Sequence, residues 1–378
     1  MKIFYWSPFF TNIATIKAVI WSAESLIKFY KKEKIDVSLI NSIGEWDNFE
    51  KQIDKNINII NLNKIKLLDY LPKNGFIKSR ISYIIIFFWN IIKLKNLVNK
   101  EEPNFLIIHL MTSLPIFLTL FFNKNTKIIL RISGLPKINL IRFLFWKLFS
   151  NRIDRVTCPT KATYDFIIKK KIFKKEKVLV LSDPIINMKE FLVKKKNNLL
   201  PVELANVNYI LGIGRLTKQK NFALLINFFI NISNKHKDIH LVIIGDGEEK
   251  ESLKKISARA NIENRVHLLG YQENAFKFLL KSKCFILSSL WEDPGFVLVE
   301  AALSNSNIIS SDCPNGPKEI IQNNGYLFKN NDVDDLTIKF EKFLKESEND
   351  SYKNKIELKK RIRIFTQYNH YKNLNKLI

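Results

Sequence analysis

The sequence predicts an α/β protein of two Rossmann-like domains, each a doubly wound parallel sheet with helices on both faces. Two observations lead to this fold class. Short apolar runs alternate with helical patterns over roughly residues 205–330, and the first half of the chain repeats that alternation less regularly. The length of 378 residues and the hydrophobic fraction of 46% are enough for two separate cores.

The first half of the chain opens with strand and helix patterns in the expected order. We predict a strand at residues 2–8, an amphipathic helix at residues 14–33 and a second strand at residues 35–41. Three later apolar runs are further predicted strands, at residues 104–110, 126–134 and 155–160. The N-terminal domain is expected to span residues 1–185, with a hinge near Leu181 to Phe191.

The second half shows the pattern more clearly. Five apolar runs each end in Gly, Ser or Asp, or in a Gly-Tyr pair, as strands do before a loop: residues 206–214, 239–247, 264–271, 283–289 and 306–312. Between the first two, Phe222, Leu225, Ile226 and Phe229 share one face of a helix. We expect this C-terminal domain over residues 186–355. A basic terminal segment, residues 356–378, is expected to cross back to the first domain.

The composition points to an anionic partner and to a reducing compartment. The chain has 61 Lys and Arg against 36 Asp and Glu, a net charge of 61 − 36 = +25. Cys158, Cys284 and Cys313 lie far apart and form no CxxC pair, which argues against a zinc site or a disulfide framework. No secretory signal is apparent at the start, so we expect a cytoplasmic protein.

Two loops that follow predicted strands carry the residues of greatest chemical interest. In GIGRLTKQKN, Arg215 and Lys220 flank a loop with Gly214, beside a helix start, which suits a diphosphate. Taken alone, this loop also fits an ordinary solvated basic turn. In WEDPGFVLVEAA, Glu292 precedes a Gly-kinked helix entrance and Glu300 lies on the helix itself. Alone, these acids also fit a helix-dipole partner and an ion-pair partner of a lysine.

Together with Gly245-Asp246-Gly247 and Gly270 after the intervening strands, these residues resemble a known family. They are similar to the retaining glycosyltransferases of family 4, among the glycosyl transferases group 1, which have the GT-B fold of two domains across a cleft. The match extends through SSDCPNGPKEII and NNGYLF to Phe328, covering the second domain densely and the first loosely. The conjunction of both loops makes the resemblance specific.

The resemblance implies a hexosyltransferase-type enzyme that moves a sugar from a nucleotide-sugar donor to a glycan or lipid-linked acceptor, in the synthesis of bacterial surface polysaccharide or lipopolysaccharide. It implies roles for individual residues. Arg215 and Lys220, with Gly214, would bind the donor diphosphate, Glu300 the ribose and Glu292 the transferred sugar. The phosphates would also meet the backbone of Gly295, Phe296 and Val297, and the base would lie near Gly270 and Tyr271. No metal or other cofactor is expected, because cationic side chains and helix N-termini would neutralise the charge of the leaving diphosphate.

The first domain is expected to bind the acceptor. His109 ends an apolar strand, where the family often has a histidine facing the sugar, although a lone histidine also fits the interior. Arg131 and Ser133 follow the next strand end. Thr11 and Asn12 lie in a first loop that, unlike that of many family members, has no glycine, so this loop is assigned to the acceptor.

Two segments of the first half are both basic and rich in aromatic residues. The run from Ile81 to Val98 is broken by Asn90, Lys93 and Lys95, so no membrane-spanning helix is expected there. A helix around residues 143–152 fits either an anionic membrane surface or a core-facing helix with a solvated basic face.

The alternatives to a glycosyltransferase are a GT-B epimerase or phosphorylase, and a basic nucleic-acid-binding protein. No recognition motif supports nucleic-acid binding.

Overall fold

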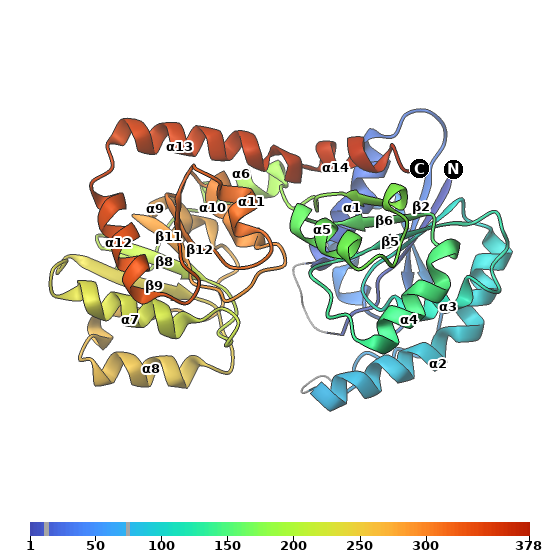
Figure 1. Cartoon of the computed structure of the whole chain (residues 1–378), viewed down its shortest axis with the longest axis horizontal. Coiled ribbons are helices and arrows are strands. Elements are labelled where there is room, and N and C mark those ends of the chain that lie inside the picture. Colours follow the sequence, from blue (N-terminus) through green and yellow to red (C-terminus); the bar gives the residue numbers. More distant parts are fainter. Residues whose placement is uncertain (11–14, 73–75) are drawn as a thin grey trace. The chain divides into compact units, whose positions relative to one another are not determined.

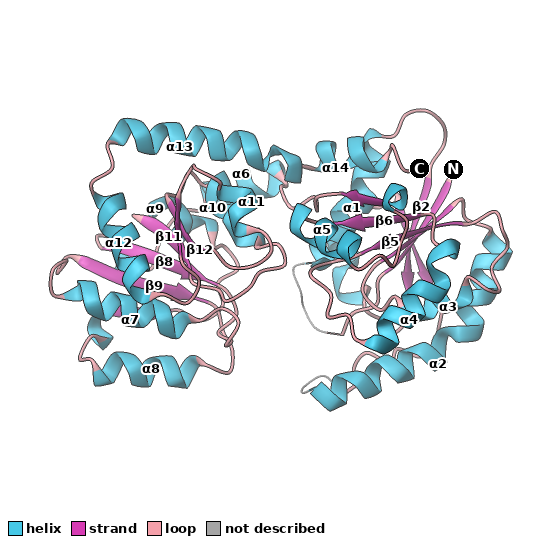
Figure 2. Cartoon of the chain, viewed as in Figure 1, coloured by secondary structure: helices cyan, strands magenta, loops and turns pink. Residues whose placement is uncertain are grey.

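The computed structural model describes residues 1–10, 15–72 and 76–378. These residues form two compact units (Figure 1). Unit 1 comprises Met1–Ile185 and Phe365–Ile378, and unit 2 comprises Ile186–Ile364. Each unit is a parallel β-sheet with helices packed on both faces, so the fold is the two-domain α/β arrangement expected from the sequence (Figure 2).

The sheet of unit 1 has seven strands in the order β3-β2-β1-β4-β5-β6-β7, all parallel. Its strands are β1 (Lys2–Trp6), β2 (Asp36–Asn41), β3 (Ile57–Asn61), β4 (Phe105–Ile108), β5 (Lys127–Arg131), β6 (Arg155–Cys158) and β7 (Val178–Val180). Phe4 of β1 lies in register with Ser38 on one side and Leu106 on the other. The winding direction reverses between β1 and β4, and the loops at the carboxyl ends near this reversal are where such sheets bind ligands.

The helices of unit 1 cover both faces of this sheet and enclose two apolar clusters. They are α1 (Thr15–Phe29), α2 (Phe76–Glu101), α3 (Ser113–Leu118), α4 (Leu140–Phe149), α5 (Lys161–Lys169) and α14 (Gln367–Leu374). Helix α4 begins where the Asn139 side chain accepts a hydrogen bond from Arg142 N, and α5 begins with the same kind of cap at Thr160.

The last residues of the chain belong to unit 1, although α13 before them belongs to unit 2. Helix α14 packs against α1, and a chain of hydrogen bonds joins the two helices to the sheet. His370 Nε2 lies 2.8 Å from Ser22 Oγ, which lies 3.0 Å from the Tyr5 hydroxyl, while His370 Nδ1 lies 2.8 Å from the carbonyl oxygen of Ser182. This buried network fixes the C-terminal segment on unit 1.

The sheet of unit 2 has six parallel strands in the order β10-β9-β8-β11-β12-β13. Its strands are β8 (Asn208–Ile213), β9 (Ile239–Ile244), β10 (Val266–Leu268), β11 (Cys284–Leu287), β12 (Ile308–Ser311) and β13 (Tyr326–Phe328). Its helices are α6 (Met188–Lys196), α7 (Phe222–Ser233), α8 (Lys250–Arg259), α9 (Phe276–Lys281), α10 (Phe296–Leu303), α11 (Pro317–Ile321), α12 (Val333–Leu344) and α13 (Glu348–Arg361). The apolar face predicted for residues 222–229 is buried, as Phe222, Leu225 and Phe229 lie in the core. Short 3-10 helices occur at Asp47–Gln52, Ser150–Arg152, Lys175–Lys177, Val202–Leu204, Glu263–Arg265 and Ile362–Phe365.

Helix α2 contains the apolar run in which no membrane-spanning helix was expected. Within the described part of the chain, it is the one helix long and apolar enough to cross a membrane, over Lys78–Glu101, by length and composition only. The polar residues that interrupt its apolar run have partners in unit 1. Asn90 is buried and its side-chain amide donates to the carbonyl of Ile86, while Asn63 accepts a hydrogen bond from Lys93 and donates one to Asn90.

Acidification should weaken unit 1 through His370, whose burial lowers its pKa from 6.5 to about 3. Between pH 6.5 and 3 the unfolded chain binds a proton at His370 that the folded chain does not bind. The contribution of neutral His370 to the free energy of unfolding is therefore complete above pH 6.5 and is lost as pH falls toward 3. The slope is about 1.4 kcal/mol per pH unit. Burial raises the pKa of Glu24 and of Glu45 to about 7, which has the opposite effect on stability. The pH dependence of the wild-type stability alone therefore does not isolate the effect of His370.

The effect of His370 is isolated by the difference in free energy of unfolding between a His370 variant and wild type. The free energy of unfolding of His370→Gln, minus that of wild type, should rise steadily as pH falls below 6.5, since glutamine keeps a donor and an acceptor but does not titrate. Urea unfolding at several pH values measures it. A difference that is constant with pH would contradict the assignment.

Candidate functional site

The loops that leave the carboxyl ends of β8, β9 and β10 are joined by backbone hydrogen bonds. Gly214 N donates to Ile244 O at 2.9 Å, and Leu216 N donates to Asp246 O at 2.9 Å. Gly245 N donates to Gly270 O, also at 2.9 Å. These bonds hold the predicted diphosphate loop, the Gly-Asp-Gly turn and the loop after β10 as one continuous surface.

Close packing between these loops explains two of their glycines. Gly245 has φ +140°, and a Cβ built there would lie 1.8 Å from the Gly214 carbonyl oxygen. A Cβ on Gly247 would lie 2.4 Å from the Leu216 carbonyl oxygen. Neither position has room for a side chain, because the neighbour in each case is backbone that cannot move aside.

Lys220 and Glu292, predicted as separate ligands of the donor, form an ion pair in this structure. Lys220 Nζ lies 2.6 Å from Glu292 Oε1, and the Ser289 hydroxyl donates to the same oxygen at 2.5 Å. Glu292 is 4% exposed, so the buried carboxylate group is stabilised by these two donors and not by water. The aliphatic chain of Lys220 lies over Gly214, since a Cβ there would sit 3.3 Å from three of its carbons.

Arg215 differs from Lys220 although both belong to the same loop. Its side chain is exposed and makes no ion pair with the residues that the structure describes. The loop therefore presents one guanidinium to solvent and holds one ammonium against a buried carboxylate. A phosphate group could meet the first directly, whereas it must compete with Glu292 for the second.

The predicted helix entrance after β11 has the expected form. Gly295 is the N-cap of α10 with φ +90° and ψ +56°, a left-handed conformation that favours glycine. The backbone N–H groups of Phe296 and Val297 open the helix, where such groups have no acceptor within the helix. Glu300 lies on the second turn and is half-buried.

The loop after β12 supports this entrance from behind. Glu292 N donates to the Pro314 carbonyl at 3.1 Å, and the Asn315 side-chain amide donates to Asp293 Oδ1 at 2.7 Å. The charges of Glu292 and Lys220 also act on Cys313, although burial is the main reason that its pKa rises to about 11. Sequence reasoning missed this support, because Asn315 and Cys313 carry no motif of their own.

The remaining predicted donor residues lie at the edge of the same surface. Gly270 has φ +67° and faces open space where a Cβ would sit, so its backbone conformation rather than crowding calls for glycine. Tyr271 beside it is exposed, and Gln272 donates to the Leu269 carbonyl at 3.1 Å. A flat, exposed aromatic ring at this position is suited to stacking on a base.

In unit 1, His109 follows β4 and is fully buried. Within the described residues, neither of its ring nitrogens has a hydrogen-bond partner. Burial, then the positive charge of Arg131 and the nearby His370, hold the pKa of His109 well below its usual range. The imidazole is therefore neutral, with one nitrogen able to donate and the other to accept.

Arg131 and Ser133 follow β5 as predicted, but the arginine faces inward. Its guanidinium is 3% exposed and forms an ion pair with Asp183, which is 1% exposed. Burial lowers the pKa of Arg131 to about 10, so it stays charged at neutral pH. Ser133 Oγ is buried without a partner among the described residues. Thr11 and Asn12 lie outside the described residues.

The comparisons with known proteins relate this chain to glycosyltransferases. Residues 198–363 match the family model of glycosyl transferases group 1. An uncharacterized glycosyltransferase of Methanocaldococcus jannaschii is 29% identical over 325 residues, 81% of this chain and 76% of the relative. The chain is a glycosyltransferase, and its residues 198–363 are similar to those of group 1.

Other similar proteins relate this glycosyltransferase to glycan synthesis and to the GT-B fold. The N-acetylgalactosamine-N,N'-diacetylbacillosaminyl-diphospho-undecaprenol 4-alpha-N-acetylgalactosaminyltransferase of Campylobacter jejuni is 34% identical over 112 residues, 30% of each protein. The crystal structure of Anabaena HepE in complex with UDP superimposes with a TM-score of 0.73 at 13% identity. It covers 100% of this chain and 99% of that one, which shows the shared GT-B fold.

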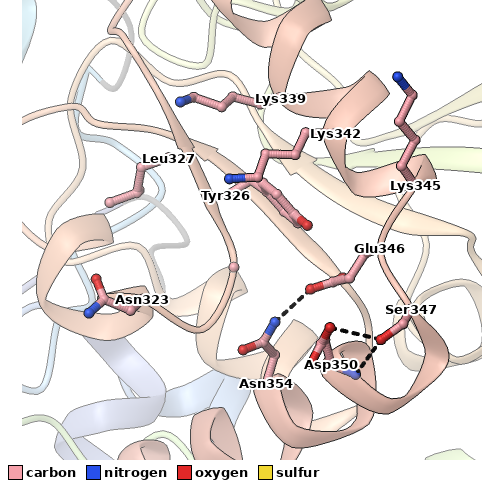
Figure 3. A pocket seen from close by; sticks show the side chains of 11 residues that line it. Asn323, Tyr326, Leu327, Lys339, Lys342, Lys345, Glu346, Ser347, Asp350 and Asn354 are labelled. Atoms are coloured by element: carbon pink, nitrogen blue, oxygen red, sulfur yellow. Dashed lines mark hydrogen bonds between the residues drawn. The ribbon is translucent and has the colours of Figure 1, made fainter.

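Residues 198–363, which match the group 1 model, contain the whole loop surface at β8 to β12, whereas His109 and Arg131 lie outside this range. A cavity of about 650 Å³ is also lined by residues of this range, but elsewhere. It is bounded by the edge strand β13, the end of α12 and the start of α13. In Figure 3, Glu346 is hydrogen-bonded to Asn354 while Lys345 points away from the cavity. It lies at the amino end of β13, away from the carboxyl ends of the strands where the predicted donor residues lie.

Within residues 1–10, 15–72 and 76–378, no group of three or more His, Cys, Asp or Glu side chains is arranged to hold a metal ion. His240 and His267 stack with ring centroids 5.2 Å apart and share a 2.9 Å hydrogen bond, but they are only a pair.

Proposed function

We propose that this glycosyltransferase moves a sugar from a nucleotide-sugar donor to a glycan or lipid-linked acceptor, with retention of the anomeric configuration. The observation that carries the proposal is the ion pair of Lys220 with the buried Glu292 beside the N-terminus of α10, at the carboxyl edge of the sheet within residues 198–363. The C. jejuni relative is named for a diphospho-undecaprenol acceptor, and other relatives for amylovoran and lipopolysaccharide core biosynthesis. Retention is supported by the family resemblance alone.

The donor diphosphate is proposed to lie between Arg215, Lys220 and the first turn of α10. Arg215 offers a forked guanidinium, Lys220 a single charge, and Phe296 and Val297 their free backbone N–H groups. Three sources of positive potential at one place suit the charge that develops on the leaving diphosphate. We therefore expect turnover without a metal ion, which a chelator added to the assay checks.

The two acids are proposed to accept hydrogen bonds from hydroxyl groups of the donor. Glu300 on the second turn of α10 takes the ribose, and Glu292 takes the sugar that is transferred. When the diphosphate draws Lys220 toward itself, Glu292 loses part of its ion pair. The sugar hydroxyls can then replace that donor, so sugar and diphosphate binding support each other.

A binding panel tests the donor site. Wild type and Glu300→Gln are titrated by calorimetry with UDP-, GDP- and other nucleotide sugars, with Glu249→Gln at the N-cap of α8 as the matched control. We expect one donor to bind wild type and the control equally, and Glu300→Gln about tenfold or more weakly. Equal affinity of all three proteins would contradict the assignment of Glu300.

His109 is proposed to hydrogen-bond the sugar during transfer through its neutral ring, which requires this side chain, 0% exposed in the structure, to become accessible to the sugar. Replacing it by alanine should lower turnover by about 10² while donor affinity changes less than threefold, because the ring acts on the reacting sugar and not on the diphosphate. Steady-state kinetics with calorimetry separates the two quantities. Unchanged turnover would make His109 a structural residue of the unit 1 interior.

A further inference from the structure

Helix α2 is apolar on two opposite faces. Residues 82, 86, 90, 94 and 98 recur every fourth position and are buried against unit 1. The opposite face carries large apolar side chains in solvent: Ile81, Ile84, Ile85, Phe88, Trp89 and Ile92. Phe88 and Ile92 are each 68% exposed. A surface helix of a soluble domain normally has a polar outer face, so the outer face of α2 is unusually apolar.

The buried face is fixed to unit 1 by polar contacts as well as by packing. The Ser82 hydroxyl donates to the Pro72 carbonyl at 2.7 Å, and the Asn63 side-chain amide donates to Asn90 Oδ1 at 2.8 Å. If α2 left the domain to cross a bilayer, it would break these bonds and uncover the apolar cluster containing Leu94 and Val98. The helix can instead keep its buried face in place and offer only its outer face.

Helix α4 repeats this arrangement. Trp146 and Phe149 are buried, whereas Leu140, Ile141, Leu144 and Leu148 are exposed along one outer face. Figure 1 shows α4 next to α2 in unit 1, and Arg142 of α4 lies within electrostatic range of Arg80 and Tyr83 of α2. The two outer apolar faces therefore belong to one region of the unit.

The charges within the apolar stretches of α2 and α4 are all positive; the acid Glu101 is the last residue of α2 and is paired with Lys2. Residues 78–100 carry Lys78, Arg80, Lys93, Lys95 and Lys100 and no acid, and residues 137–152 carry Lys137, Arg142, Lys147 and Arg152 and no acid. A second copy of the chain would bring like charges together at this region. A nucleic acid would leave the large apolar side chains in water. An anionic lipid surface satisfies both features, because its headgroups neutralise the cations while its acyl boundary takes the apolar groups.

We propose that the outer faces of α2 and α4 form a membrane-docking face, made by Ile84, Phe88 and Ile92 of α2 and Ile141, Leu144 and Leu148 of α4. This face binds the surface of an anionic bilayer, with both helices lying in the interface and neither spanning it. The inference does not rest on the proposed function, although it would bring a lipid-linked acceptor to the enzyme.

Vesicle cosedimentation of the full chain tests the docking face. Wild type should bind phosphatidylcholine vesicles that contain phosphatidylglycerol, bind pure phosphatidylcholine vesicles far less, and lose binding as salt rises. The variant Phe88→Ser/Leu148→Ser should bind the anionic vesicles about tenfold or more weakly, since two apolar side chains leave the interface. The matched control is Leu199→Ser/Val202→Ser, which changes exposed apolar residues in unit 2 and should bind as wild type does.

Several outcomes would overturn the proposal. One is wild type that does not sediment with anionic vesicles, and another is equal binding by the Phe88/Leu148 variant and the control. Protein that stays with the vesicles after an alkaline carbonate wash would indicate a spanning helix. Self-association of wild type that the Phe88/Leu148 variant abolishes, without vesicle binding, would make this face a contact between copies. Donor affinity, measured on the same variants, should not change, so failure of this proposal is distinguishable from failure of the donor site.

Discussion

Replacing Lys220 by alanine should lower turnover by about 10²–10³ and weaken donor binding, because an ammonium group beside the leaving diphosphate is removed. The same change should also lower the free energy of unfolding of unit 2. Glu292 is 4% exposed and would be left with only the Ser289 hydroxyl as a side-chain donor. Leaving one partner of such a pair unpaired costs about 3 kcal/mol. Kinetics and urea unfolding measure the two effects.

Two further variants separate these effects. Lys218→Ala alters an exposed lysine of the same loop and should change neither quantity beyond about 0.5 kcal/mol. Lys220→Met/Glu292→Gln removes both charges, so it should recover most of the lost stability while turnover stays low. If Lys220→Ala instead binds donor and turns over like wild type, the ion pair is structural and the diphosphate lies elsewhere.

Much of this site could be predicted because it depends on local sequence. Gly245 leaves no room for a side chain and Gly295 has a left-handed backbone conformation, and both stand in loops that follow apolar runs predicted as strands. In a parallel sheet such turns share one edge, so the pattern of strands and loops alone assigns Arg215, Lys220, Glu292 and Glu300 to one surface. The fold class followed from the same alternation and was confirmed.

What could not be predicted depends on contacts between distant residues. Lys220 and Glu292 are separated by 72 positions, and nothing in either loop indicates that they pair with each other. The His370–Ser22 hydrogen bond joins residues 348 positions apart. Likewise, Asn63 lies 27 positions from Asn90 and 30 from Lys93, so the sequence does not show that it pairs with both.

Arg131 illustrates how such a distant contact changes an assignment. Its place after β5 suggested a side chain that meets the acceptor, yet its guanidinium is buried and paired with Asp183 after β7. An acceptor can no longer be its direct partner without breaking that pair. We infer that Arg131 acts through its charge, which is the second cause, after burial, of the low pKa of His109.

Arg131→Ala should be among the most destabilising single changes in unit 1. Asp183 is 1% exposed and would become a buried carboxylate without its cation, which costs about 3–5 kcal/mol. Urea unfolding measures the loss, and Arg155→Ala on the neighbouring strand β6 is the control. That arginine is exposed, and its removal should cost less than about 0.5 kcal/mol.

The double variant Arg131→Met/Asp183→Leu distinguishes a charge effect from a packing effect and keeps the test informative if Arg131→Ala does not fold. It removes both charges and fills the space, so stability should return to within about 1–2 kcal/mol of wild type. The pKa of His109 should then rise but remain below 6.5, because the arginine charge is gone while burial persists. Histidine resonances followed by NMR during a pH titration measure that change. A stable double variant with an unaltered His109 titration would show that Arg131 serves the fold of unit 1 alone.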